Sequence, residues 1–197
     1  MGYHRAGFEV VGVDIKPQPH YPFEFYQADA MTYPLDGFDV IHASPPCQKF
    51  SRLIRGLRKG DTKALDLISE TRNLLKTTGL PYVIENVEGS PLDANFLCGS
   101  SFGLELWRHR YFETSPMMLL FPTCRHDLVK EPWGVFSRGG GGWITQKRIA
   151  RGNKAKEVME MPWATQQEIG QAVPPAYTEF IGEQLMRSLE EVHEEMR

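Results

Sequence analysis

Cysteine is scarce in this sequence, with three residues among 197: Cys47, Cys98 and Cys124. An odd number of widely spaced cysteines does not form a disulfide framework, so we expect reduced thiols and a cytoplasmic protein. The sequence also lacks a run of ~18 apolar residues and a signal-peptide pattern. It therefore predicts neither a transmembrane helix nor secretion.

An excess of positive charge is missing as well. The formal net charge is -3, so the composition as a whole does not indicate a nucleic-acid-binding protein, although local basic patches remain compatible with one. Hydrophobic residues make up 41% of the chain and charged residues 24%, which excludes global disorder and predicts a packed core. The length and the absence of internal repeats predict one domain.

Short apolar runs alternate with helical patterns along the chain, which is typical of an α/β protein. Strands are predicted at residues 8–15, 23–30, 38–43, 80–87 and 107–113. Helices are expected from Asp61 to about residue 78 and from Pro175 onwards. The second helix has an apolar stripe of Ile181, Leu185, Leu189, Val192 and Met196.

Two consecutive predicted strands each end in an aspartate, Asp14 and Asp29. In dinucleotide-type folds an acid at this position accepts hydrogen bonds from ribose hydroxyls. The alternative for each is an aspartate that caps a turn. The repetition favours a ligand crevice at this edge of the sheet.

Cys47 follows the predicted strand 38–43 and the two prolines that stop it, in the stretch Ser44–Phe50. Its place at the carboxyl end of a strand suggests a nucleophile. Taken alone, however, a single cysteine fits a small buried hydrophobe better.

The predicted strand 80–87 ends in two polar residues, Glu85 and Asn86. Burying a carboxyl group is costly without a partner, so we expect Glu85 to have a function or a fixed partner.

Two stretches are basic and contain no acidic residue. The first, residues 51–60, carries Arg52, Arg55, Arg58 and Lys59 beside Cys47, and suits a phosphate-bearing substrate. The second, residues 138–156, is glycine-rich and holds six basic residues and one tryptophan, which suits nucleic acid. Solvated surface loops are the alternative for both stretches.

Cys124 and His126 are spaced like two ligands of a zinc ion. No matching second pair is evident in the sequence, so we expect no metal site.

The order of these pieces resembles the DNA cytosine-5 methyltransferases that use S-adenosylmethionine, and in particular the short methylases encoded by bacteriophages. Ser44-Pro45-Pro46-Cys47-Gln48 is similar to the Pro-Cys-Gln nucleophile motif of that family, and Glu85-Asn86-Val87 matches its Glu-Asn-Val motif. Arg108-His109-Arg110 matches the Arg-x-Arg half of Gln-x-Arg-x-Arg, with Leu106 in place of Gln. The stretch 170–175 resembles the closing Gly-Asn-x-Val-Pro-Pro motif, with Gln171 in place of Asn.

The resemblance implies a Rossmann-like class I methyltransferase fold and a chemical mechanism. The Cys47 thiolate adds to C6 of cytosine and activates C5 towards the methyl group. Glu85 holds or protonates N3, for which a raised pKa at a buried strand end is expected. Arg108 and Arg110 grip the base carbonyl or a flanking phosphate, and in duplex DNA the cytosine is flipped out first.

The resemblance also assigns binding residues. The expected S-adenosylmethionine-binding residues are Asp14, Ile15, Asp29, Ala30, Pro45 and Gln171. The expected DNA-binding residues are Gln48, Ser51, Arg52, Arg55, Asn86, Lys147 and Arg148.

The chain departs from the family pattern in two places. It begins after the first strand and the glycine-rich cofactor loop, so cofactor affinity is expected to be poor. Only 59 residues separate Arg110 from Gly170, which leaves a very small target-recognition segment. We expect a catalytic domain over 1–137, a reduced recognition segment over 138–160, and a closing region over 161–197 that rejoins the catalytic domain. Two alternatives stay open: methylation of a free cytosine nucleotide, and an inactive DNA- or nucleotide-binding remnant.

Overall fold

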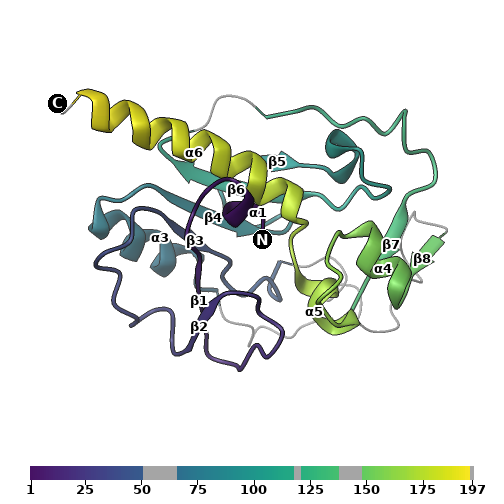
Figure 1. Ribbon diagram of the computed structural model, residues 1–197, viewed down its shortest axis with the longest axis horizontal. Coiled ribbons are helices and arrows are strands. Elements are labelled where there is room, and N and C mark those ends of the chain that lie inside the picture. Colours follow the sequence, from purple (N-terminus) through teal and green to yellow (C-terminus); the bar gives the residue numbers. More distant parts are fainter. Residues whose placement is uncertain (51–65, 118–120, 138–147, 196–197) are drawn as a thin grey trace. The chain divides into compact units, whose positions relative to one another are not determined.

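The computed structural model describes residues 1–50, 66–117, 121–137 and 148–195 (Figure 1). The protein is mixed α/β, as predicted, and contains both parallel and antiparallel strand pairs. It divides into two compact units. The first comprises 1–33, 99–108 and 124–197, and the second comprises 34–98 and 109–123. Within the described ranges, the helices are too short or too polar to cross a lipid bilayer.

The second unit contains a mixed sheet with the strand order β3-β4-β6-β5. The strands are β3 (Ile41–Ala43), β4 (Tyr82–Asn86), β5 (Asn95–Leu97) and β6 (Arg110–Ser115). β3 runs parallel to β4, with Ala43 opposite Ile84, whereas β6 is antiparallel to β4 and β5. Every residue of β4 is buried, and its sequence is accordingly apolar on both faces until Glu85.

Helix α3 (Ile68–Thr78) lies in the crossover that two parallel strands require, between β3 and β4. It ends at Gly79, whose φ of 69° is a left-handed conformation that glycine adopts without strain. The helix buries Leu75 against Tyr82 and Ile84 of β4. Partly buried residues extend this core: Leu35, Ile41, Ala43 and Leu92.

The first unit contains the parallel pair β1 (Val11–Asp14) and β2 (Glu24–Gln27), with Asp14 opposite Gln27. Helix α1 (Gly2–Arg5) packs against the long helix α6 (Pro175–Glu195), and Arg5 donates to Glu179 at 3.1 Å. α6 buries Tyr177, Ile181 and Leu185, which recur every four residues along one face.

Five shorter elements complete the first unit. They are η1 (Gly99–Phe102), β7 (Trp133–Val135), β8 (Arg148–Ala150), α4 (Asn153–Val158) and α5 (Gln166–Gln171). β7 and β8 pair in parallel, with Gly134 opposite Ile149. α5 begins with a capping box, in which Thr165 and Glu168 each bond the other's backbone N–H.

The predicted strands at 8–15, 23–30, 38–43 and 80–87 are confirmed with shorter bounds, and α6 begins at Pro175 as expected. The prediction for 107–113 is wrong at its start, because β6 begins at Arg110 and leaves Arg108 outside the strand. β5 and η1 lie between residues 92 and 106, where the sequence predicted no helix or strand. The predicted helix start at Asp61 lies outside the described residues.

Candidate active site

Cys47 lies in a turn that is anchored at both ends. The backbone N–H of Phe50 donates to the Cys47 carbonyl at 3.0 Å, and the Phe50 side chain is buried. The neighbouring Lys49 forms an ion pair with Asp66 at 2.9 Å, just before α3. The Cys47 thiol is half-buried, unlike the fully enclosed Cys98. The turn therefore holds Cys47 in place without burying it completely.

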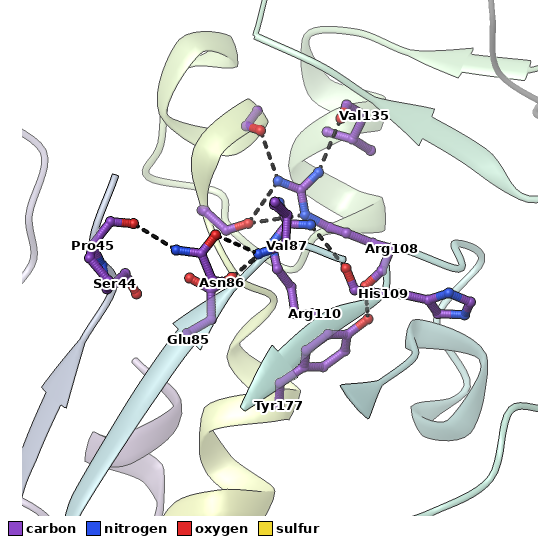
Figure 2. A network of polar contacts seen from close by, with 12 residues as sticks. Ser44, Pro45, Glu85, Asn86, Val87, Arg108, His109, Arg110, Val135 and Tyr177 are labelled. Carbon is purple, nitrogen blue, oxygen red and sulfur yellow. Dashed lines mark hydrogen bonds and ion pairs between the residues drawn. The ribbon is translucent and has the colours of Figure 1, made fainter. Parts of the chain in front are cut away.

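Asn86 fixes the other side of this turn. Its side-chain amide donates to the carbonyl of Pro45 at 2.9 Å, and its Oδ1 accepts from the Val87 backbone N–H at 2.9 Å (Figure 2). The side chain is buried, with 1% of its surface exposed. A buried amide at the end of β4 is therefore explained by its hydrogen bonds, which tie the Pro-Pro-Cys stretch to the Glu-Asn-Val stretch.

Glu85 has the fixed partner that the sequence predicts. The Nε of Arg110 lies 3.0 Å from Glu85 Oε1, and both side chains are largely buried. The antiparallel register of β4 and β6 places Phe112 opposite Glu85, and Arg110 starts the same strand two residues earlier. The Arg110 guanidinium therefore supplies the buried carboxyl group with a hydrogen-bond donor and a counter-charge.

His42 is a residue of this region that the sequence analysis did not select. It lies in β3, and its Nε2 is 3.1 Å from the hydroxyl oxygen of Ser44, the first residue of the nucleophile-like motif. Desolvation lowers the pKa of His42 to about 4, so the imidazole is neutral near pH 7. The sequence does contain a signal for His42, namely a histidine inside the apolar strand that ends at the nucleophile-like motif.

Arg108 lies in the first unit, where its guanidinium donates to four backbone carbonyls, and Figure 2 shows the bond to the Val135 carbonyl. The acceptors are Val135 at 3.1 Å, Ile169 at 3.4 Å, Gly170 at 2.8 Å and Ala172 at 2.8 and 3.0 Å. Three of these carbonyls lie in or next to the closing motif 170–175. In this structure the Arg108 side chain therefore holds that motif in place, and its expected contact with the base or phosphate remains a prediction.

Two further contacts order the closing motif. The hydroxyl of Tyr177, which is fully buried, donates to the Arg108 carbonyl at 2.8 Å. A Cβ atom at Gly170 would lie 2.1 Å from the Ser137 backbone nitrogen, so only glycine allows this approach. Gln171, the residue in the position of the family's asparagine, ends α5.

Asp14 and Asp29 lie at the same edge of the first unit's parallel pair, because Asp14 is the last residue of β1 and Asp29 follows the carboxyl end of β2. Asp14 accepts from the Lys16 backbone N–H at 2.8 Å and from Gln18 Nε2 at 3.0 Å, and Asp29 accepts from the Met31 N–H at 2.9 Å. Ile15 beside Asp14 is 67% exposed. Carboxylate oxygens next to an exposed apolar side chain form a surface that suits a ribose and an adenine ring.

The basic stretches are described only in part. Ser51, Arg52, Arg55 and Lys147 lie outside the described residues. Arg148 stacks on the ring of Trp133 at 3.9 Å, and Lys154 pairs with Glu105 at 3.2 Å and Glu157 at 2.7 Å. These intramolecular contacts partly neutralise the segment, and its expected contact with DNA remains a prediction.

No protein-family model matches this chain, and no curated protein is significantly similar to it.

Proposed function

We propose that this protein is a DNA cytosine-5 methyltransferase of the class I, Rossmann-like type, with Cys47 as its nucleophile. The observation that carries the proposal is the convergence of three motif residues on one sheet edge of the second unit. Cys47 follows the carboxyl end of β3, and Glu85 lies near the carboxyl end of the parallel β4. Arg110 starts the antiparallel β6 at that same edge and contacts Glu85.

These side chains suit the chemistry of cytosine. C5 is a weak nucleophile until a thiolate adds to C6, and the bond from Cys47 Sγ to C6 supplies that activation. Glu85 and Arg110 together form a polar pair that can hold N3 and the ring carbonyl as charge develops on the base. Loss of the C5 proton and cleavage of the Sγ–C6 bond then release the product and regenerate Cys47.

S-adenosylmethionine, when bound, supplies the methyl group. The residues present fit it in the first unit, where Asp14 and Asp29 offer acceptors for ribose and adenine and Ile15 offers an exposed apolar face. Both aspartates keep their backbone turns while they do so, because each carboxylate oxygen has more than one lone pair.

Covalent trapping tests the proposal directly. The chain is incubated with S-adenosylmethionine and duplex DNA that contains 5-fluorocytosine, whose fluorine cannot leave as a proton does. We expect a denaturant-stable protein–DNA adduct and its loss in Cys47→Ser, with the Cys47→Ser chain unfolding at the same temperature as the natural one. An adduct that persists in Cys47→Ser would contradict the assignment of the nucleophile.

The same assay separates the other candidates. Methyl transfer to dCMP without transfer to duplex DNA would show that the substrate is a free nucleotide and not DNA. Binding of DNA with neither transfer nor adduct would instead identify a binding module that has no catalytic activity.

A further inference from the structure

A cationic side chain, Lys49, lies two residues after Cys47 in the same turn. The turn is held by other groups, because the Phe50 backbone N–H donates to the Cys47 carbonyl and the Phe50 ring is buried. The Lys49 ammonium group lies 5.9 Å from the centre of that ring, and the Lys49 side chain is 49% exposed. Lys49 therefore combines a fixed backbone with a charge that solvent reaches.

Asp66 is the partner of this charge. Its Oδ2 accepts from Lys49 Nζ at 2.9 Å, and its side chain is 30% exposed. The hydrogen bond from Lys49 lowers the pKa of Asp66 below its ordinary value, so the carboxyl group is an anion near neutral pH. An ion pair between two partly exposed side chains is weak, because water solvates the separated charges almost as well. The ammonium group can therefore exchange Asp66 for a stronger anionic partner.

Asp66 keeps a second partner when Lys49 leaves it. Asp66 lies just before helix α3, and its Oδ1 accepts from the backbone N–H of Ile68 at 3.4 Å. The N–H groups in the first turn of a helix stabilise a nearby carboxylate. Loss of the lysine therefore does not leave the Asp66 carboxylate without a donor, which makes the exchange less costly.

We propose that Lys49 binds a backbone phosphate of the DNA beside the target cytosine, and that Asp66 competes with this phosphate for the ammonium group. The inference rests on the proposed function. A base attacked by Cys47 is joined to its phosphates through one sugar ring, and Cα atoms two residues apart are at most about 7 Å from one another, so Lys49 is within reach. A phosphate offers strong acceptor oxygens for a charge-assisted hydrogen bond. Asp66 then keeps the affinity for DNA below its maximum.

DNA titrations of the full chain test the inference. Binding of a fluorescently labelled duplex that contains cytosine is measured by anisotropy at several KCl concentrations. Lys49→Met keeps the aliphatic stem and removes the charge, so it should weaken binding and reduce the slope of log K against log salt concentration by about 0.9. Asp66→Asn keeps an acceptor for the helix and removes the competing charge, so it should strengthen binding roughly two- to fivefold. In the double variant this gain should fall by at least half, because the two residues act on the same contact.

Lys76→Met and Asp39→Asn are the matched controls. They remove one exposed charge of each sign from the same unit, in the last turn of α3 and before the start of β3, and should leave the salt slope unchanged. A gain of affinity cannot come from a variant that fails to fold, so the Asp66→Asn result is independent of stability.

The outcomes separate this inference from the proposed function. If the natural chain binds DNA and Lys49→Met binds it with the same salt slope, the inference alone is overturned. An equal gain from Asp66→Asn and Asp39→Asn, or an undiminished gain in the double variant, overturns the competition by Asp66. A natural chain that binds no duplex DNA contradicts the proposed function and this inference together.

Discussion

The side-chain amide of Asn86 donates a 2.9 Å hydrogen bond to the carbonyl of Pro45, two residues before Cys47. The two residues are 41 positions apart in the sequence, and each belongs to a different motif of the proposed methyltransferase. This bond links the strand that carries Glu85 to the turn that carries Cys47, the proposed nucleophile.

Removing the Asn86 amide should impair the proposed reaction more than the fold. Asn86→Ala leaves the Pro45 carbonyl without its donor, which should cost about 1–2 kcal/mol of unfolding free energy. Displacement of Cys47 should lower the rate of adduct formation roughly 10- to 100-fold. Urea unfolding and single-turnover trapping measure the two effects. Asn95→Ala, at an exposed position of β5, is the control and should change neither.

Arg108 should prove essential for the stability of the first unit. A lysine at this position has one ammonium group and cannot reach four carbonyls, so Arg108→Lys should lower the unfolding free energy by roughly 2–4 kcal/mol. Arg187→Lys, on the exposed face of α6, should leave it unchanged. Equal stability of the two variants in urea would show that the carbonyl contacts do not matter.

The ion pair between Arg72 and Glu113 should stabilise the second unit. The two form bonds of 2.6 and 2.7 Å, and Arg72 also donates to the Pro91 carbonyl at 2.9 Å. Burial raises the pKa of Glu113, but the hydrogen bonds and charge of Arg72 outweigh it and lower the pKa below its usual value. Glu113→Gln should cost about 3 kcal/mol, because it leaves a partly buried guanidinium without its counter-charge.

The matched control for that pair is Arg125 with Asp127, whose side chains are 52% and 65% exposed. Asp127→Asn should not change the urea midpoint measurably, because solvent screens an exposed pair.

The stability that Glu113 contributes through its ion pair with Arg72 is present at neutral pH. It is lost as the pH falls through the lowered pKa, since the folded carboxylate must then take up a proton.

His42 should make the protein less stable in mild acid. Burial lowers its pKa from the ordinary value of 6.5 to about 4 in the folded protein, so only the unfolded chain binds the extra proton between these two values. Stability is therefore complete above pH 6.5 and falls by up to about 3 kcal/mol towards pH 4. His42→Gln cannot take up this proton, so its unfolding free energy should depend less on pH over that range. Identical pH profiles for the two chains would contradict the assignment.

The sequence predicted the elements whose residues carry a strong local pattern. Two β-branched runs, before Asp14 and around Ile84, were sufficient to predict strands, and a four-residue apolar repeat was sufficient to predict α6. Burial of one face or of both faces of an element dictates these patterns. β5, β7 and β8 escaped prediction. Each has three residues, and such strands are defined by their partners rather than by their own composition.

The candidate site was predictable to a similar extent. Short motifs in a recognisable order pointed to Cys47, Glu85 and Arg110. The cost of burying a carboxyl group predicted that Glu85 has a partner. The contacts of Arg108 were not predictable, since its acceptors are backbone carbonyls that lie 27 to 64 residues away. Every residue has such a carbonyl, so the residue types do not reveal which ones accept. The pairing of Leu97 with Arg110 likewise depends on a strand register that sequence spacing does not encode.

The packing of α1 on α6 has a consequence for the order in which the protein folds during synthesis. The described strands of the second unit lie between residues 41 and 115, so that sheet can form as soon as this stretch has left the ribosome. α1 leaves the ribosome well before the helix on which it packs, which begins at Pro175. α1 therefore packs only after α6 has been synthesised, and the long loop closure between these two helices makes the first unit the slower of the two to assemble.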